Sequence, residues 1–258
     1  MRKIFCDYLK FRLTFVNLVS IILIITKNEV IILSLKNYER PSLTTDIVLF
    51  RIFNMQSSNS RKNAYKRLQV LLIERSTEPQ KGKWSLPGGF VNIDEEIGDN
   101  VLRKLKEKTG VNGNFYTEQL YTWGNVDRDE RGRVISVSYL GLVKPETYIN
   151  SGGTEKQRWV DVEVALQEDL AFDHVEIIKY AVERLKGKME YTDIVFNLLP
   201  DEFTIQDIKA IYELLFYKRQ DNFRRRIEKY VEPLNKIRSG GQFRPAELYK
   251  WKKENSDD

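Results

Sequence analysis

The sequence contains very little of the side-chain chemistry on which disulfide-bonded domains, zinc sites and many hydrolases depend. Its 258 residues include one cysteine, Cys6, and one histidine, His174. A disulfide within the chain and a multi-cysteine zinc site are therefore excluded. Catalysis by a Ser–His or Cys–His pair would have to use His174, which we expect instead to cap or pack at the start of a helix. Such sparing use of cysteine fits a cytoplasmic protein.

The chain also lacks a large net charge, but its charge is unevenly distributed. The net charge is +5, whereas the segment from Lys218 to Lys253 alone holds 12 basic and 4 acidic residues, a local excess of +8. The remainder is therefore slightly acidic, and we expect a polyanion to bind in this C-terminal segment. Hydrophobic residues make up 41% of the chain, which is enough for a packed core.

The N-terminal extension, residues 1–37, is open to several interpretations. A basic start is followed at residues 13–26 by an almost wholly apolar run, which has the length of a signal-peptide core but no small-residue cleavage site after it. The run is also short for a membrane-spanning helix. It is compatible with a strand or hairpin, a weak membrane anchor, or a start placed upstream of the true one. We favour the last, because the recognisable domain begins near Tyr38, and we expect no stable membrane association.

The central part of the chain alternates strands with helices. Apolar and β-branched residues predict five strands, the first two paired as a hairpin: residues 44–53, 68–74, 115–122, 134–143 and 159–164. Between them Ile97, Val101 and Leu105 recur at helical spacing. We expect that helix to begin with Asp94 as its N-cap and to end at Gly110. This order indicates an α/β sandwich with a mixed sheet.

The same patterns predict three regions after the extension. Residues 38–170 form the α/β domain, and residues 171–191 form a connecting helix that starts at Asp173. Residues 192–258 form a second domain of short helices that ends in a Gly-Gly turn.

A motif in the first domain resembles the Nudix box. It keeps the family's spacing over a loop, a helix and a second loop, with Gly89, Glu95, Arg103, Leu105, Glu107, Gly110 and Val111 as its members. The preceding stretch WSLPGGFV at residues 84–91 also looks like that family. The resemblance implies a Nudix α/β/α sandwich.

The motif departs from the family at two positions that matter for chemistry. Nudix enzymes cleave a diphosphate and need divalent metal to neutralise phosphate charge and to activate water. The family's three helix glutamates correspond here to Lys104, Glu107 and Lys108. Each reversal of charge within a few Å of a metal ion costs several kcal/mol. We therefore expect no bound metal, and interpret Glu95, Arg103 and Glu107 as the remnant of a catalytic site.

Two interpretations of the lysines remain open. In one, Lys104 and Lys108 replace the metal and bind a phosphate directly as fixed cations. In the other, both belong to a solvated helix face that formed once catalysis was lost.

The stretch at residues 121–139 resembles the corresponding segment of the NrtR family, the Nudix-related transcriptional regulators, in which it lines the ligand pocket. Its arginines suit a phosphate or a sugar. The competing interpretation is a charged hairpin loop in which Asp127 and Asp129 pair with the arginines. The predicted ligand-binding residues are Arg75, Lys83, Trp84, Gly88, Gly89, Lys104, Lys108, Arg128, Arg131 and Arg133.

The second domain has the pattern of a helix-turn-helix. Thr204 and Asp207 form a capping-box-like start. In the segment at residues 221–230, helical projection places Phe223, Ile227 and Tyr230 on one face. Outward residues of such a helix reach base edges, and flanking arginines bind phosphates. With a wing at the turn 239–242, the predicted DNA-binding residues are Asn222, Arg224, Arg225, Arg226, Lys229, Arg238 and Arg244.

The order of these segments resembles the C-terminal winged helix of the NrtR family, so the resemblance covers nearly everything after residue 38. It implies a homodimeric regulator, most often a repressor, that binds operator DNA and senses a sugar, a sugar phosphate or an ADP-ribose-like nucleotide. The alternative is a Nudix hydrolase that cleaves ADP-ribose or a related diphosphate. We expect no cofactor, with Mg²⁺ required only in the hydrolase alternative. Weaker still is a basic domain that binds RNA or an acidic protein.

Overall fold

The computed structural model describes residues 39–55, 65–111, 113, 115–145, 147, 153–217, 223–238 and 245–252. The predicted N-terminal extension, residues 1–37, lies outside the described residues. Ser42–Asp258 forms one compact unit. No helix in the described ranges is long and apolar enough to cross a membrane.

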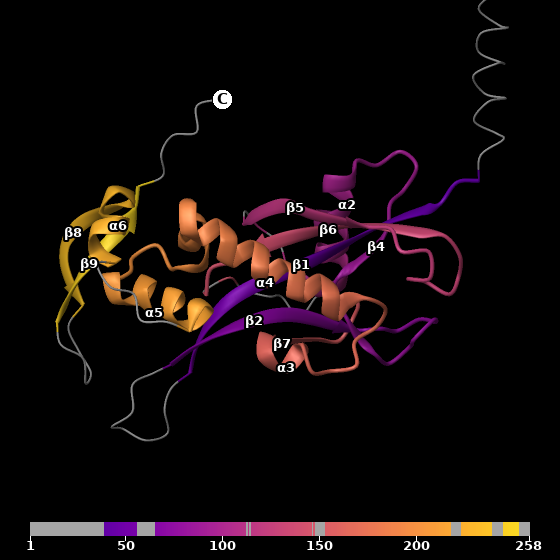
Figure 1. Ribbon diagram of the computed structural model, residues 1–258, viewed down its shortest axis with the longest axis horizontal. Coiled ribbons are helices and arrows are strands. Elements are labelled where there is room, and N and C mark those ends of the chain that lie inside the picture. The colour runs from indigo at the N-terminus through magenta and orange to yellow at the C-terminus, as the bar shows by residue number, and fades with distance from the viewer. Residues whose placement is uncertain are drawn as a thin grey trace, which may run out of the picture. The chain divides into compact units, whose positions relative to one another are not determined.

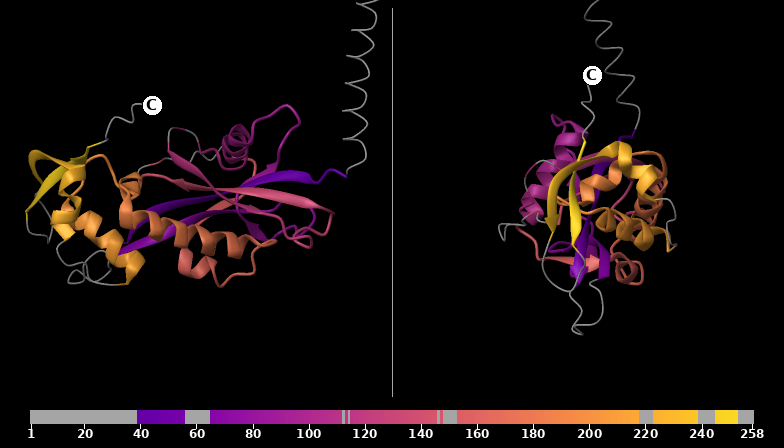
Figure 2. Two further views of the ribbon diagram at one scale, coloured as in Figure 1. Left: turned by 45° about the horizontal axis from the view of Figure 1, so that its top comes forward. Right: turned by 90° about the vertical axis from the view of Figure 1, so that its left-hand side faces the viewer.

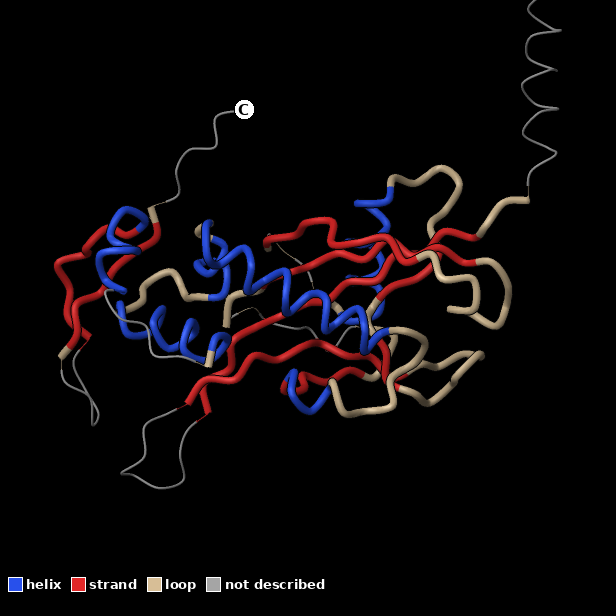
Figure 3. Tube along the Cα trace, viewed as in Figure 1, coloured by secondary structure: helices blue, strands red, loops and turns tan. Residues whose placement is uncertain are grey.

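A mixed sheet, seven-stranded within the described residues, forms the centre of the first domain (Figures 1 and 3). Its strands are β1 (Ser42–Met55), β2 (Tyr65–Glu74), β3 (Trp84–Ser85), β4 (Gly88–Phe90), β5 (Tyr116–Trp123), β6 (Val134–Leu142) and β7 (Gln157–Asp161). The main path runs β3-β2-β1-β6-β5, while β4 pairs with β1 and β7 with β2. β1 is antiparallel to β2 and β4 and parallel to β6. β1 therefore contacts three other strands and positions the loops between them.

Both faces of the sheet are buried, because successive residues of β1 point to opposite sides. Leu49 joins a smaller hydrophobic cluster with Val101 of α2 (Ile97–Thr109). Phe50 joins a larger cluster that includes the apolar face of α4 (His174–Tyr191). Figure 2 shows α2 and α4 on opposite sides of the sheet. This layering confirms the predicted α/β/α sandwich.

The remaining elements complete the first domain and build the second. They are α3 (Val162–Ala165), η1 (Ile194–Leu198), α5 (Ile205–Phe216), α6 (Phe223–Ile227), η2 (Glu228–Tyr230), β8 (Val231–Arg238) and β9 (Ala246–Trp251). The predicted capping box of Thr204 and Asp207 begins α5. β8 and β9 form an antiparallel hairpin, and Phe203 bridges to Tyr249 of β9. Helices followed by such a hairpin confirm a winged helix.

Three expectations from the sequence are wrong in detail. The N-cap of α2 is Glu96 and not Asp94, so Glu95 lies in the preceding loop. The strand predicted at residues 159–164 ends at Asp161, where α3 begins. The second domain is not made of short helices alone, because β8 and β9 follow α6. Most of β8 is exposed, so it has little of the apolar alternation by which strands are recognised.

Two glycines provide a test of this packing. A Cβ at Gly88 would lie 2.1 Å from the Thr45 carbonyl oxygen and 2.4 Å from Asp46 Oδ1, whereas a Cβ at Gly98 would meet nothing within 4 Å. We expect Gly88→Ala to lower the free energy of unfolding by about 1–3 kcal/mol or more, as overpacking does. Gly98→Ala, the matched control in α2, should raise it by about 0.5–1 kcal/mol. Urea unfolding measures both, and equal stability of Gly88→Ala and wild type would contradict the packing of β4 on β1.

Candidate ligand site and nucleic-acid interface

The Nudix-box-like segment forms an ion-pair network beside α2. Arg103 donates from Nε to Glu95 Oε1 at 2.5 Å and from Nη2 to Glu95 Oε2 at 2.7 Å. Its Nη1 donates to Glu107 Oε1 at 3.0 Å, and Lys104 Nζ donates to Glu107 Oε2 at 3.1 Å. The structure thus brings together the three predicted remnant residues, and it neutralises both carboxylates with cations from the same helix.

The network keeps both carboxylates ionised. Hydrogen bonds from Arg103 and Asn100 lower the pKa of Glu95 to about 2. The pKa of Glu107 is lowered first by its hydrogen bond from Arg103 and also by Lys104. The pairs raise the pKa of Arg103 in turn. Carboxylates whose pKa values are lowered in this way are poor proton acceptors near neutral pH.

This arrangement does not fit a divalent cation. Mg²⁺ takes oxygen ligands in near-octahedral geometry, with carboxylates bound directly to it. Here Arg103 and Lys104 already bind the carboxylate oxygens of Glu107, and a metal ion would meet the charge of Lys104 itself. Nowhere in the described part of the chain do three or more Asp, Glu, His or Cys side chains gather in a way that could hold a metal ion.

The predicted glycines let the chain pass close to this network. Gly88 lies directly against Asp46 of β1, as its short Cβ distances require. A Cβ at Gly89 would lie 3.0 Å from both Cδ and Cε of Lys104. The aliphatic stem of Lys104 therefore lies along the Gly89 backbone, which directs its ammonium group toward Glu107.

Lys108 lies one helical turn after Lys104. Its ammonium group makes no hydrogen bond or ion pair with the residues that the structure describes. Burial lowers the pKa of Lys108; Glu155 and Asp46 oppose this shift, and Arg75 and Lys104 reinforce it. Two carboxylates and two cations therefore act electrostatically on Lys108.

Arg75 and Arg131 both lie close to an aromatic ring that sequence reasoning did not select. Their Cζ atoms lie 4.8 and 5.8 Å from the centroid of Phe172. Arg131 pairs with Asp129 at 2.6 Å, whereas Arg75 donates to the carbonyl oxygens of Pro79 and Thr77. The charge of Arg75 is thus not balanced by a directly bound carboxylate. Phe172 has a φ of 53°, in the left-handed region, which its sequence context does not signal.

The other arginines of the predicted pocket bind within the protein. The side chain of Arg128 is only 4% exposed and donates to both carboxylate oxygens of Asp173, at 2.9 and 2.7 Å. Arg133 donates to the carbonyl oxygens of Gly124 and Asn125 and closes the hairpin loop. Internal pairing, the competing interpretation of this loop, is therefore present, with Asp173 rather than Asp127 as the partner of Arg128.

Lys83 and Trp84 contact residues outside α2. Lys83 pairs with Asp169 at 2.8 Å. The ring of Trp84 packs against the larger hydrophobic cluster and lies 4.0 Å from Arg158 Cζ. The structure does not place these two residues beside the lysines of α2.

His174 begins α4 and is buried, as its sequence position predicts. Its Nδ1 accepts a hydrogen bond from the Leu86 backbone N at 2.9 Å, so the neutral ring carries its proton on Nε2. Nε2 lies 3.6 Å from Asp46 Oδ1, and Ser136 Oγ donates to Asp46 Oδ2 at 2.6 Å. Burial lowers the pKa of His174, and Asp46 opposes this shift.

The far end of α4 contacts the winged helix. The Met189 carbonyl oxygen accepts hydrogen bonds from Tyr212 Oη at 2.8 Å and from Arg226 Nη2 at 3.1 Å. The Arg226 guanidinium also lies 4.6 Å from the Tyr212 ring centroid. One helix thus reaches from the loop at Leu86 to a predicted DNA-binding arginine.

The basic residues of α6 differ in the number of contacts that they make within the protein. Phe223 and Ile227 are buried, as predicted. Arg224 donates to Tyr249 Oη at 3.3 Å and lies 3.7 Å from Glu228. Arg225 is exposed and has no hydrogen bond or ion pair within the described ranges. Arg225 is therefore the most available cation of this helix.

Other predicted DNA-binding residues lie around the hairpin. Lys229 Nζ lies 4.5 Å from the Tyr230 ring centroid. Arg238 of β8 pairs with Asp207 of the capping box at 2.9 Å. Asn222 and Arg244, and the predicted wing turn at residues 239–242, lie outside the described residues.

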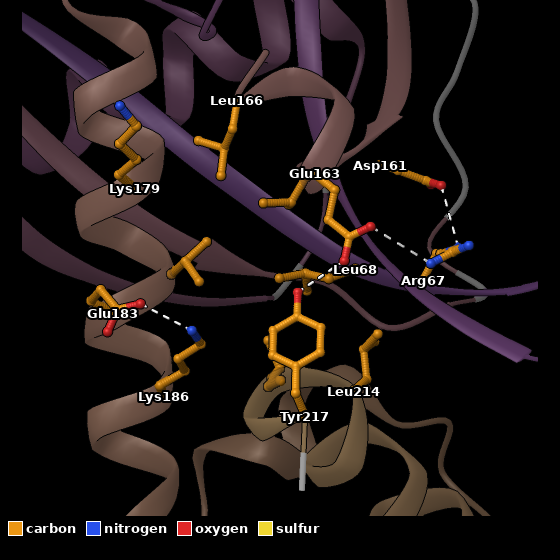
Figure 4. Close-up of a pocket in the computed structure, with 13 residues that line it drawn as sticks. Arg67, Leu68, Asp161, Glu163, Leu166, Lys179, Glu183, Lys186, Leu214 and Tyr217 are labelled. Atoms are coloured by element: carbon orange, nitrogen blue, oxygen red, sulfur yellow. Dashed lines mark hydrogen bonds and ion pairs between the residues drawn. The ribbon is translucent and has the colours of Figure 1, made fainter.

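A cavity of about 180 Å³ lies where α3 and α4 meet the end of α5 (Figure 4). Apolar side chains such as Leu166 and Leu214 line it, and Tyr217 Oη donates to Glu163 at 2.9 Å. None of the predicted ligand-binding residues lines this cavity. The cavity lies at the junction of the two domains and is separate from the ion-pair network on α2.

Comparison with known proteins identifies relatives of both halves of the chain. The NUDIX domain model matches residues 59–181, and the NrtR DNA-binding winged helix domain model matches residues 195–251. The ADPR responsive transcriptional repressor NtrR of Acinetobacter baylyi is 36% identical over 224 residues, which cover 83% of this chain and 84% of that protein.

A solved structure and an enzyme are also similar. Shewanella oneidensis NrtR in complex with a 27mer DNA has a TM-score of 0.69 and 36% identity, and the match covers 81% of this chain and 93% of that one. The ADP-ribose pyrophosphatase of Methanocaldococcus jannaschii is 36% identical over 112 residues, which cover 43% of this chain and 64% of that protein.

The buried imidazole predicts a pH-dependent stability. Since the folded-state pKa of His174 is lowered, the unfolded chain takes up a proton near pH 6.5 while the folded protein does not. The free energy of unfolding should therefore fall as the pH falls from 7 to 5. His174→Asn, which keeps an acceptor for Leu86, should lack this component, and no other histidine contributes. Urea unfolding at several pH values checks this, and parallel curves for both proteins would refute it.

Proposed function

This chain belongs to the NrtR family of Nudix-related transcriptional regulators, and we propose that it is a DNA-binding repressor whose Nudix domain senses ADP-ribose. The observation that carries the proposal is the ion-pair network of the Nudix box. Arg103 and Lys104 occupy the carboxylates of Glu95 and Glu107, while an exposed Arg225 lies in the attached winged helix. Such a site is suited to holding a ligand and poorly suited to cleaving it.

The charges of the site indicate the chemical class of the ligand. Among the described residues, the Lys108 ammonium has no partner, and Arg75 binds only backbone carbonyl groups through hydrogen bonds. These cations favour a phosphorylated ligand over a free sugar. The name of the Acinetobacter baylyi repressor, which responds to ADPR, makes ADP-ribose the first candidate.

The helix α4 provides a physical connection between ligand and DNA. His174 at its first residue binds the Leu86 N–H, two residues before Gly88, and Met189 near its end binds Arg226. A ligand that displaces the loop at Leu86 would act on this helix. Regulation then requires that ADP-ribose bind the DNA-competent and DNA-incompetent states with different affinity.

The oligomeric state of the protein and its compartment in the cell follow from the same proposal. Winged-helix regulators read two half-sites related by two-fold symmetry, so we propose a homodimer on duplex operator DNA. DNA binding by a chain with a single cysteine fits the cytoplasm.

A hydrolase is the second candidate, because the Methanocaldococcus jannaschii pyrophosphatase is similar to the Nudix half. The pairing of Glu107 with Arg103 and Lys104 opposes it. One experiment separates the two. Purified full-length protein is titrated in a gel shift with DNA upstream of its own and neighbouring genes, and ADP-ribose, pentoses and pentose phosphates are added with and without Mg²⁺.

We expect specific binding that intact ADP-ribose releases, without formation of AMP in the same mixtures. Mg²⁺-dependent release of AMP without specific DNA binding would establish the hydrolase instead. Specific binding released by a pentose would keep the repressor and replace its effector.

Arg225 tests the DNA interface. If its exposed guanidinium contacts the operator, Arg225→Ala should weaken specific binding by about 1–3 kcal/mol per contact. ADP-ribose affinity and the urea midpoint should remain those of wild type. The matched control is Lys106→Ala, which removes an exposed positive charge from α2 and should leave operator affinity unchanged. Equal losses in the two variants would indicate a general charge effect.

A further inference from the structure

The two lysines of the Nudix box point to a metal-independent mode of ligand binding, an inference that rests on the proposed function. We propose that Lys104 and Lys108 take the place of the divalent cation and bind the diphosphate of the ligand directly. The site would thus accept phosphorylated ligands when no metal ion is present.

Lys104 is positioned by its stem and retains free hydrogen-bonding capacity. The stem lies along Gly89, with Cδ and Cε 3.0 Å from the position of a Cβ there. Its ammonium donates one hydrogen bond, to Glu107 Oε2 at 3.1 Å. An ammonium group has three donors, so two remain for phosphate oxygens.

Lys108 and Arg75 supply charge that the protein itself does not neutralise by direct contact. Lys108 has no hydrogen bond or ion pair to any residue in the described ranges, and Arg75 donates to Pro79 and Thr77 carbonyl oxygens. A diphosphate diester carries two negative charges, which two cations balance. The carboxylates of Glu155 and Asp46 also act on Lys108, and they would favour a ligand held toward Lys104 and Arg75.

The environment of these lysines differs from that of a solvated helix face. Lys106, between them in sequence, is exposed, whereas Lys108 is half-buried. The side chain of Lys104 is only 22% exposed. Ammonium groups are strongly hydrated, so a partly buried lysine without a partner is costly until an anion binds.

Two lysines in place of a metal ion separate two tasks that the metal ion performs together. A bound metal neutralises phosphate charge and also activates water. Ammonium groups perform the first task only, because a protonated amine cannot accept a proton from water. The site therefore holds a diphosphate without attacking it, which is the property that a sensor requires.

The test is calorimetric titration of the full-length protein with ADP-ribose, AMP and pyrophosphate, each in EDTA and in Mg²⁺. We expect wild type to bind ADP-ribose with the same Kd in both buffers. Each lysine makes a charge-assisted contact, so Lys104→Ala and Lys108→Ala should each raise Kd about tenfold, and the double variant about 100-fold. Lys106→Ala, on the same helix, should bind like wild type.

A second variant provides an independent readout. Lys104→Glu with Lys108→Glu restores the carboxylates of the family motif and should abolish binding in EDTA. Mg²⁺ should restore part of that binding, although it has no effect on wild type. Urea unfolding identifies variants that fail to fold, and the magnesium rescue requires a folded protein.

The proposal is overturned if EDTA abolishes ADP-ribose binding by wild type, if no phosphorylated probe binds in EDTA, or if the double alanine variant binds like wild type. Failure of the proposed function has a different signature. Metal-free binding that depends on both lysines, without any effect of ADP-ribose on the gel shift, would support the lysine site and refute the repressor mechanism.

Discussion

The carboxylate of Asp46 is buried where four parts of the Nudix domain meet, and their arrangement depends on it. Ser136 of β6 donates to it at 2.6 Å, and the Nε2 atom of His174 in α4 lies 3.6 Å away. Gly88 of β4 packs directly against it, and Arg128 lies 3.9 Å away. A buried charge is tolerated only when donors and cations surround it. The contacts that satisfy the Asp46 carboxylate therefore hold Gly88, the sheet and α4 in a single geometry.

The ion-pair network of the Nudix box is built on that geometry, but its charges differ from those of a metal-dependent site. In a metal-dependent site, carboxylates gather a cation, and the cation gathers the phosphates. Here Arg103 and Lys104 neutralise Glu95 and Glu107, and the Lys108 ammonium makes no ion pair within the described ranges. Lysines at these two positions leave the fold of the helix unchanged, because neither belongs to its buried stripe, which includes Val101 and Leu105.

A single helix, α4, contacts both halves of the chain. α4 packs on the sheet through its apolar face and carries polar contacts at both ends, His174 to Leu86 and Met189 to Arg226. Over 15 residues a helix rises roughly 22 Å, and its backbone hydrogen bonds make it stiff over that length. α4 therefore connects the Leu86 loop directly to the winged helix.

Local patterns determined much of this protein from the sequence alone. Runs of apolar and β-branched residues located the central strands, the glycine at position 110 ended α2, and the Nudix-box spacing brought Glu95, Arg103 and Glu107 to one site. These features depend on neighbours within a few residues. Only the tertiary structure decided that Arg128 binds Asp173 and that two arginines lie close to the Phe172 ring. It also decided that α4 joins the two domains, because such contacts form between residues far apart in the chain, where charge and spacing carry no record of the partner.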